Sequence, residues 1–343
     1  MSDSAISLAI KAVARGEELD PVTLEAAFET ILAGGAAPEE IGALLMGLAV
    51  RGETASELIA GARAMRAAGR RHRVEGPLLD TCGTGGLTWR SLNTSTAAAI
   101  VIAGAGGHVA KHGNRSVPPK TGSADVLEAL GVNLDIDDQT FLACLDGAGV
   151  GFMYARTHHT AMRHVAPIRA QLGIRTIFNL LGPLTNPAGA RRQVLGVYAS
   201  HWVRPMAEAL RALGTDHALV VHGVDGIDEV SVSGETLVAE IGHGEINEYT
   251  LTPAMMGLKP SPLSALAGGP AEENAQAIRD LLEGRPGPFR DIVMANAGAG
   301  LYVLGEAESL VAGTLLAGEA IDSGRAARAL DRLSALSHGR DVP

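Results

Sequence analysis

Two short loops between residues 78 and 125 carry residue types that bind anions. The first follows the apolar residues Leu78 and Leu79 and reads Gly83-Thr84-Gly85-Gly86. Because glycine lacks a Cβ, its backbone N–H can approach a ligand closely, and the Ser/Thr-rich segment 91–96 can begin a helix with further free N–H donors. The pattern predicts a phosphate cradle, although a plain strand-to-helix turn could use the same glycines.

The second loop, Lys111-His112-Gly113-Asn114-Arg115-Ser116, has a different chemistry. Lys111 and Arg115 supply cationic donors, which hold phosphate or carboxylate groups strongly, and His112 and Asn114 supply directional donors. Two unlike loops suggest a ligand with phosphates at both ends. The structural alternatives are a surface lysine at 111 and an ion-paired arginine at 115.

The glycine spacing argues against two common nucleotide-binding motifs. Thr88 stands where the third glycine of GxGxxG should be, and the chain contains no GxxxxGK[ST] string. Neither a dinucleotide-binding fold nor a P-loop NTPase is therefore supported.

Two adjacent carboxylates, Asp228 and Glu229, follow an apolar run at 218–222 and the turn 223–226. Carboxylates on a loop at the carboxyl end of a strand can reach Mg²⁺, which prefers oxygen ligands and substrate phosphates. A solvated acidic turn is the simpler interpretation of this pair.

The run His158, His159 and His164 resembles a metal cluster, but it has no nearby carboxylates, and we interpret it as packing or lining a cleft.

The chain resembles the anthranilate phosphoribosyltransferase family over nearly its whole length. The strings that carry the resemblance are GTGG at 83–86, Asn93 with Ser95 and Thr96, KHGNRS at 111–116, GSADVLEALGV at 122–132, Arg169, RTIFNLLGPLTNP at 175–187, and Asp228-Glu229. The resemblance implies transfer of ribose phosphate from phosphoribosyl pyrophosphate (PRPP) to the amino group of anthranilate. The products would be N-(5-phosphoribosyl)anthranilate and pyrophosphate, in tryptophan biosynthesis.

The resemblance also implies site residues and a cofactor, Mg²⁺. The positions that match PRPP contacts are Gly83, Gly86, Ser91, Asn93, Thr94, Ser95, Thr96, Lys111, His112, Gly113, Asn114, Arg115, Ser116 and Ser123. The anthranilate pocket would comprise Gly83, His112, Asn114 and Arg169, with Arg169 on the substrate carboxylate, and the metal would be linked to Ser95, Asp228 and Glu229.

Two segments depart from the family pattern. Leu87 replaces an aspartate after the glycine loop, and Pro118-Pro119 replaces a serine pair, removing two hydroxyls and two backbone donors. These departures keep three alternatives open: a paralogue with another aromatic acceptor, a related nucleoside phosphorylase, and a non-catalytic nucleic-acid-binding relative of the same fold.

Composition narrows the function classes. A chain of 343 residues is long enough for two domains. Its net charge of −10 disfavours binding to nucleic acid, and an aromatic content of 3% provides few side chains on which bases could stack. We see no apolar run near the ~18 residues of a membrane helix and no signal peptide. Two cysteines suit a reducing compartment, so we expect a cytoplasmic location.

Apolar periodicity predicts helices from residue 4 to about 70, and short strands alternating with helices follow from Leu78, which favours a parallel sheet. Residues 230–252 predict antiparallel strands with a turn at Ser233-Gly234, and helices return from Pro270. The predicted fold is thus a small all-helical domain with a large α/β domain whose central sheet is mainly parallel. By resemblance, the helical domain would span 1–72 with a return at about 168–192, the α/β domain would span 73–167 and 193–343, and the helical domain would form a homodimer.

Overall fold

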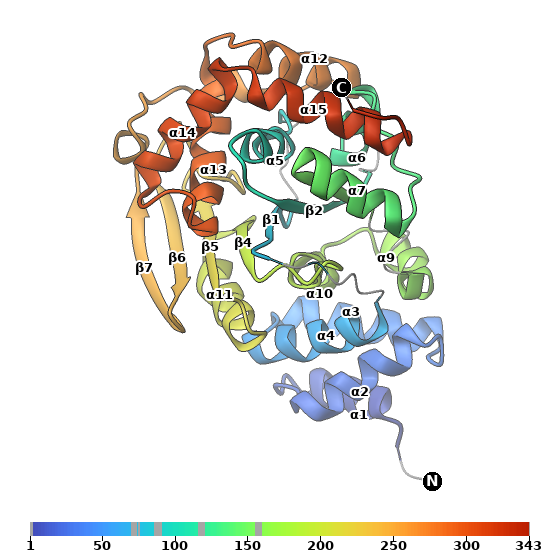
Figure 1. Ribbon diagram of the computed structural model, residues 1–343. Helices are drawn as coiled ribbons and strands as arrows, with labels where there is room; N and C mark the ends of the chain where they lie inside the picture. The colour runs from blue at the N-terminus through green and yellow to red at the C-terminus, as the bar shows by residue number, and fades with distance from the viewer. Residues whose placement is uncertain are drawn as a thin grey trace.

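A computed structural model describes residues 3–69, 74, 76–85, 91–115, 121–154 and 160–342 (Figure 1). The predictions that concern Gly86, Leu87, Ser116, Pro118-Pro119 and His158-His159 lie outside these residues. Among the described residues, no helix is long and apolar enough to cross a membrane.

The amino-terminal segment forms the predicted helical bundle. Its helices are α1 (Ala5–Ala14), α2 (Pro21–Leu32), α3 (Pro38–Arg51) and α4 (Ala55–Ala68). Thr54 caps α4: its hydroxyl accepts from the Glu57 N–H, and the Glu57 carboxylate accepts from the Thr54 N–H at 3.0 Å. Figure 1 shows this bundle at one end of the molecule, away from the carboxyl-terminal helices.

The rest of the chain builds one seven-stranded sheet with the order β3-β2-β1-β4-β5-β6-β7. The strands are β1 (Leu79–Gly83), β2 (Val109–Gly113), β3 (Val150–Tyr154), β4 (Arg192–Gly196), β5 (His217–Gly223), β6 (Thr236–Gly242) and β7 (Glu245–Leu251). The first five strands are parallel to one another, and β6 and β7 are antiparallel to their neighbours. The predicted fold class, a helical domain plus a mainly parallel sheet with an antiparallel portion, is confirmed.

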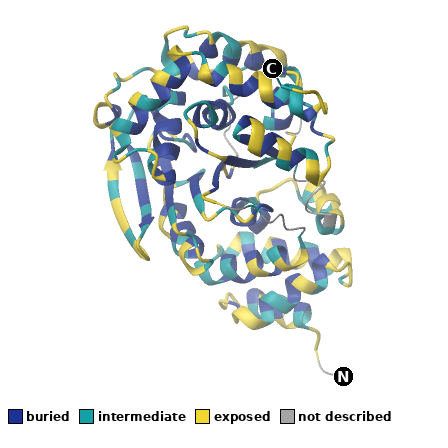
Figure 2. Cartoon of the chain, viewed as in Figure 1, coloured by how far each residue is buried: buried dark blue, intermediate teal, exposed yellow. Residues whose placement is uncertain are grey.

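Helices cover both faces of this sheet. The helices of this part of the chain are α5 (Thr94–Gly104), α6 (Ser123–Ala129), α7 (Asp138–Ala148), α9 (Ala166–Leu172), α10 (Ile177–Leu181), α11 (Val203–Ala212), α12 (Ala271–Leu282), α13 (Pro288–Leu304), α14 (Leu310–Asp322) and α15 (Arg325–Ser337). Helices α5, α7, α11, α13 and α15 contact the strands. Successive residues of β5 point to opposite faces of the sheet and belong to different hydrophobic cores. Leu219 packs with α5 and α13, whereas Val220 packs with the helical bundle and α11. The parallel strands β1 to β5 are accordingly buried on both sides, whereas the edge strand β7 is largely exposed (Figure 2).

Helix α10 lies within the predicted return to the helical domain and α9 overlaps its start, and the two contact α4 and α3 respectively. The domain boundaries themselves stay a prediction.

The predicted turn at Ser233-Gly234 is wrong, because the hairpin between β6 and β7 turns at His243-Gly244. Both of these residues have positive φ, 52° and 80°, which is the geometry of a two-residue turn matched to strand twist. Ser233 instead lies before β6, where its N–H donates to the Ser231 hydroxyl at 2.9 Å. The segment around Ser233 is therefore stabilised by local hydrogen bonds to side chains, and not by pairing with a strand.

Candidate functional site

The site begins where the strand order changes direction. Strands β1 and β4 are neighbours, but the chain leaves β1 toward β2 on one side and leaves β4 toward β5 on the other. Gly83 and Gly196 are paired at the carboxyl ends of β1 and β4. In open α/β sheets, the crevice outside such a switch point is where ligands bind.

The loop after β5 brings Asp228 directly over this crevice. One carboxylate oxygen of Asp228 accepts a hydrogen bond from the Gly85 N–H at 2.8 Å. A Cβ on Gly83 would lie 2.4 Å from the same oxygen, and a Cβ on Gly196 would lie 1.7 Å from the Asp228 backbone oxygen. Both glycines are therefore required by the close approach of the acidic loop.

Glu229, Ser95 and Lys111 meet beside Asp228. The Lys111 ammonium donates to the Ser95 hydroxyl at 3.1 Å and to the Thr81 carbonyl oxygen, and its side chain is buried. Burial and the neighbouring Asp228 carboxylate raise the pKa of Glu229 to about 8, against the opposing effects of Lys111 and the Ser95 N–H. Burial likewise raises the pKa of Asp228 and lowers the pKa of Lys111.

This donor set fits a hard divalent cation. The pKa values of the two adjacent carboxyl groups are both raised, so a cation beside them would stabilise their ionised forms. The Ser95 hydroxyl lies beside them. Oxygen donors of this kind suit Mg²⁺. The three predicted metal-linked residues are thus brought into one neighbourhood, and their role as ligands stays a prediction.

His112 is held by a buried carboxylate that the sequence analysis did not single out. Its Nδ1 lies 2.6 Å from the Asp80 Oδ2, and Asp80 is fully buried. Burial alone would raise the pKa of Asp80, but His112, the Asn186 amide and Lys111 together hold it below its usual value. An ionised Asp80 keeps a proton on Nδ1 of His112, which leaves Nε2 as the nitrogen available to a ligand.

Cys82 lies beside this pair, and its thiol, the Asp80 carboxylate and the His112 ring could together suggest a metal centre. The contacts favour a hydrogen-bond network. The Gln193 amide donates to the Cys82 sulfur at 3.1 Å and to the Pro183 carbonyl oxygen at 2.8 Å. Burial also raises the pKa of the Cys82 thiol well above its usual value, which opposes the thiolate that a metal would need.

The start of α5 presents the predicted Ser/Thr-rich segment. Asn93 precedes the helix, and its side-chain oxygen accepts from the Asn274 amide of α12 at 2.8 Å. Ser91 forms an isolated bridge with Ala267. Thr94 and Thr96 are buried, and the Thr96 hydroxyl has no hydrogen-bond partner among the described residues. The helix start is thus fixed from the opposite side by a residue far along the chain.

The far end of the second loop is tied to α6. A Cβ on Gly113 would lie 2.2 Å from the Ser123 hydroxyl, so the glycine allows these two predicted PRPP contacts to approach. Arg115 forms ion pairs with Asp125 at 3.1 Å and with Glu128. These ion pairs match the alternative interpretation of Arg115 as an ion-paired arginine. Asn114 is exposed beside it. Contact of Asn114 and Arg115 with PRPP stays a prediction.

Arg169 lies on α9, and its guanidinium donates to the Asn179 side-chain oxygen at 3.2 Å and lies 5.8 Å from the Phe178 ring centroid. Burial lowers the pKa of Arg169.

His164 packs against the helical bundle. Its ring lies so close to Gly34 that a Cβ on this glycine would be 2.6 Å from the ring. His164 is thus a packing residue, as its sequence context suggested.

Three residues of the site escaped the sequence analysis: Asp80, Gly196 and Asn274. Asp80 stands inside an apolar strand, LDTCG, where a buried carboxylate needs a charged partner, and this was a usable signal. Gly196 ends an ordinary-looking strand, and Asn274 lies 181 residues from its partner Asn93. Spatial proximity alone reveals these two.

Comparison with known proteins gives consistent matches along the chain. The glycosyl transferase family, helical bundle domain, matches residues 7–69, and the glycosyl transferase family, a/b domain, matches residues 75–327. The chain is 64% identical to an anthranilate phosphoribosyltransferase of Hyphomonas neptunium, over 99% of this chain and 100% of the relative.

Two solved structures share the fold. The anthranilate phosphoribosyltransferase of Thermus thermophilus is 48% identical with a TM-score of 0.91, covering 96% of this chain and 99% of its own. The Saccharomyces cerevisiae enzyme in complex with PRPP and Mg is 27% identical with a TM-score of 0.89, covering 98% of this chain and 99% of its own.

Proposed function

The chain belongs to the anthranilate phosphoribosyltransferase family, and on that premise we propose that it transfers the phosphoribosyl group of PRPP to anthranilate. The observation that carries the proposal is the meeting of the glycine loop and the acidic pair at the switch point, where the Gly85 N–H donates to Asp228. Of the alternatives, a nucleic-acid-binding relative is disfavoured by the net charge of −10 and by identity to named enzymes over the full chain.

The proposed reaction forms a bond between the anthranilate nitrogen and the anomeric carbon of the ribose, while the bond from that carbon to pyrophosphate breaks. An uncharged aromatic amine already carries a nucleophilic electron pair, so a strong base is not required, and the proton that the nitrogen loses after attack passes to the released pyrophosphate or to water. Mg²⁺, held by Asp228 and Glu229 with Ser95 beside them, would neutralise charge on the diphosphate. A relative's complex with PRPP and Mg supports this cofactor.

The chain's own groups would organise the donor substrate. The N–H groups of the glycine loop and of the start of α5 would bind phosphate oxygens, as helix starts and glycine loops do. The buried Lys111 holds Ser95 against the acidic pair. A fixed arrangement of donors lowers the barrier because little reorganisation remains at the moment of reaction.

A fluorescence assay tests this function. We expect anthranilate fluorescence to fall when PRPP and Mg²⁺ are both present, and to stay constant when either is left out. Retained fluorescence with all three components present would refute the proposed acceptor.

Arg169 tests the acceptor side of the site. Replacing Arg169 by alanine is expected to raise the KM for anthranilate about 10- to 100-fold with a small change in the KM for PRPP, because a charge-assisted carboxylate contact contributes roughly 1.5 to 3 kcal/mol. Steady-state kinetics with each substrate varied gives the two constants. Arg163→Ala, an exposed arginine on the adjacent 3₁₀ turn, is the control. Equal changes in both constants would assign Arg169 a structural role.

We also propose that the helical bundle forms a homodimer. Its helices expose large apolar side chains: Val22 is 76% exposed, Met46 38% and Val50 79%. Met46 and Val50 share one face of α3 because they are four residues apart. Met46→Glu with Val50→Glu should therefore convert a dimer to a monomer in analytical ultracentrifugation, whereas Val224→Glu, at an exposed turn, should not. An unchanged sedimentation coefficient in the double variant would place the interface elsewhere.

A further inference from the structure

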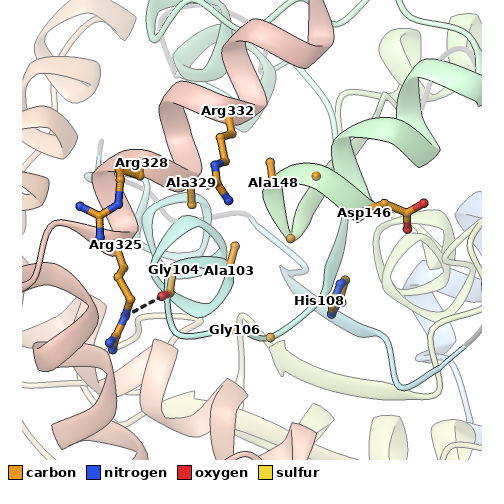
Figure 3. A pocket seen from close by; sticks show the side chains of 13 residues that line it. Ala103, Gly104, Gly106, His108, Asp146, Ala148, Arg325, Arg328, Ala329 and Arg332 are labelled. Atoms are coloured by element: carbon orange, nitrogen blue, oxygen red, sulfur yellow. Dashed lines mark hydrogen bonds between the residues drawn. The ribbon is translucent and has the colours of Figure 1, made fainter. Parts of the chain in front are cut away.

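A second pocket lies at the amino ends of β2 and β3, whereas the site described above lies at the carboxyl ends of the strands. It has a volume of about 370 Å³ and is lined by the end of α5, the end of α7 and one face of α15, together with His108 just before β2 (Figure 3). A volume of this size is within the range of small-molecule sites. Helix α5 separates it from the residues around Asn93 by its own length, roughly 16 Å.

Three arginines of α15 give this pocket its charge. Arg325, Arg328 and Arg332 all line it, and their spacing of three and four residues places them on one helical face. Arg325 Nε donates to the Gly104 carbonyl oxygen at 3.1 Å, and Arg328 approaches the Ser323 carbonyl oxygen at 3.4 Å. Figure 3 shows Arg332 reaching between Ala329 and Ala148.

These arginines lack the carboxylate partners that several other arginines of this acidic protein have. Arg191, Arg204 and Arg290 each form an ion pair with an aspartate or glutamate. Within the described ranges, no ion pair involves the three pocket arginines. Asp146 is the carboxylate on the pocket wall, and Asp322, near the helix start, is already paired with Arg290. The pocket therefore keeps an excess of positive charge.

The walls of the pocket are held at fixed separation by close backbone packing. A Cβ on Gly104 would lie 2.5 Å from the Ala326 Cα, so the end of α5 and the start of α15 touch directly. A Cβ on Gly149, which has a φ of 73°, would lie 3.1 Å from the Gly107 carbonyl oxygen. Small residues at these contacts leave the cavity open between the ends of α5 and α7 and the arginines of α15.

We propose that this pocket binds a small phosphate-bearing anion. Guanidinium groups match the geometry of phosphate oxygens through paired N–H donors, and three of them suit a ligand of more than one negative charge. The His108 ring adds a further nitrogen on the opposite wall. Inorganic diphosphate and a sugar phosphate share the chemistry that such a cluster would recognise.

Calorimetric titration of the full chain, in a buffer of physiological ionic strength without Mg²⁺, tests the proposal. The probes are orthophosphate, pyrophosphate and ribose 5-phosphate, added separately to the wild type and to Arg328→Gln/Arg332→Gln. Arg325 is left in place because it contacts Gly104. The control is Arg211→Gln/Arg340→Gln, which changes two exposed arginines that do not line the pocket and has the same net charge. Circular dichroism melting checks that each variant folds.

We expect the wild type and the control to bind one more anion per chain than Arg328→Gln/Arg332→Gln, with phosphoribosyl transfer unchanged in all three. Tighter binding of ribose 5-phosphate than of pyrophosphate would identify a sugar phosphate as the ligand class, and the reverse order would identify the inorganic anion. Equal stoichiometry in the wild type and the pocket variant, or the same loss in the control, would overturn the proposal.

Discussion

Replacing Asp228 by asparagine together with Glu229 by glutamine is expected to abolish Mg²⁺-dependent turnover while the fold remains intact. The two carboxylates lie against the glycine loop and Ser95, and burial raises the pKa of both, so a cation beside them would stabilise their ionised forms. Neutral amides keep the size of both side chains but remove the charge that attracts a cation. We expect a loss of at least about 10³-fold in kcat/KM at saturating Mg²⁺.

The same variant gives a second readout in the pH dependence of stability. The pKa of Glu229 rises from 4.5 to about 8 on folding, so the unfolded chain loses this proton first as the pH rises. The free energy of unfolding of the metal-free wild type therefore falls as the pH rises between these two values, whereas the double variant lacks this contribution. The melting temperature of the variant relative to the wild type should be higher at pH 8 than at pH 5.

Addition of Mg²⁺ at pH 8 should raise the melting temperature of the wild type and leave that of the double variant unchanged, since a cation that binds the native state stabilises it. If the double variant retained wild-type turnover and the same Mg²⁺ response, the acidic pair would be a solvated turn and the metal assignment would be wrong.

Gly196→Ala is expected to damage the site almost as severely, although position 196 carries no functional group. Its new Cβ would lie 1.7 Å from the backbone oxygen of Asp228 and 2.4 Å from its carbonyl carbon. Because these are backbone atoms, a side-chain rotation cannot relieve the clash, and the end of β4 or the acidic loop must move. Displacement of about 1 Å in a catalytic arrangement can cost roughly 10²-fold in rate.

The measurement is the Mg²⁺ concentration for half-maximal turnover together with the melting temperature. We expect a large increase in the Mg²⁺ requirement and a destabilisation of about 1 to 3 kcal/mol. Gly242→Ala is the matched control, because it also ends a strand and no atom lies within 4 Å of its new Cβ. A wild-type Mg²⁺ profile in Gly196→Ala would show that the acidic loop tolerates this movement.

The sequence was most informative where a residue type has one main physical use. Glycines at 83 and 85, the hydroxyl-rich start of α5 and the acidic pair lie in one neighbourhood, as the family resemblance implied. Parallel strands place their carboxyl ends at the same edge of the sheet, so residues that follow them converge. Residue periodicity likewise predicted the helical bundle and the mainly parallel sheet.

Sequence reasoning failed where a choice depends on tertiary partners. Ser233-Gly234 has typical turn residues, but His243-Gly244 makes the hairpin because the strands on either side pair in that register. The loop sequence did not specify the ion pairs that Arg115 forms with two carboxylates of α6, and the contact of Arg115 with PRPP stays a prediction. Asp80 gave no reason to expect His112 as its partner, since the two lie 32 residues apart on neighbouring strands.

The most direct test of the central claim measures two quantities in one reaction: pyrophosphate released and anthranilate consumed. With the purified chain, PRPP, Mg²⁺ and anthranilate, we expect pyrophosphate release and anthranilate consumption to rise together in a one-to-one ratio, and mass spectrometry to identify N-(5-phosphoribosyl)anthranilate as the product. Pyrophosphate release that continues without loss of anthranilate, or no release in the presence of both substrates, would contradict it.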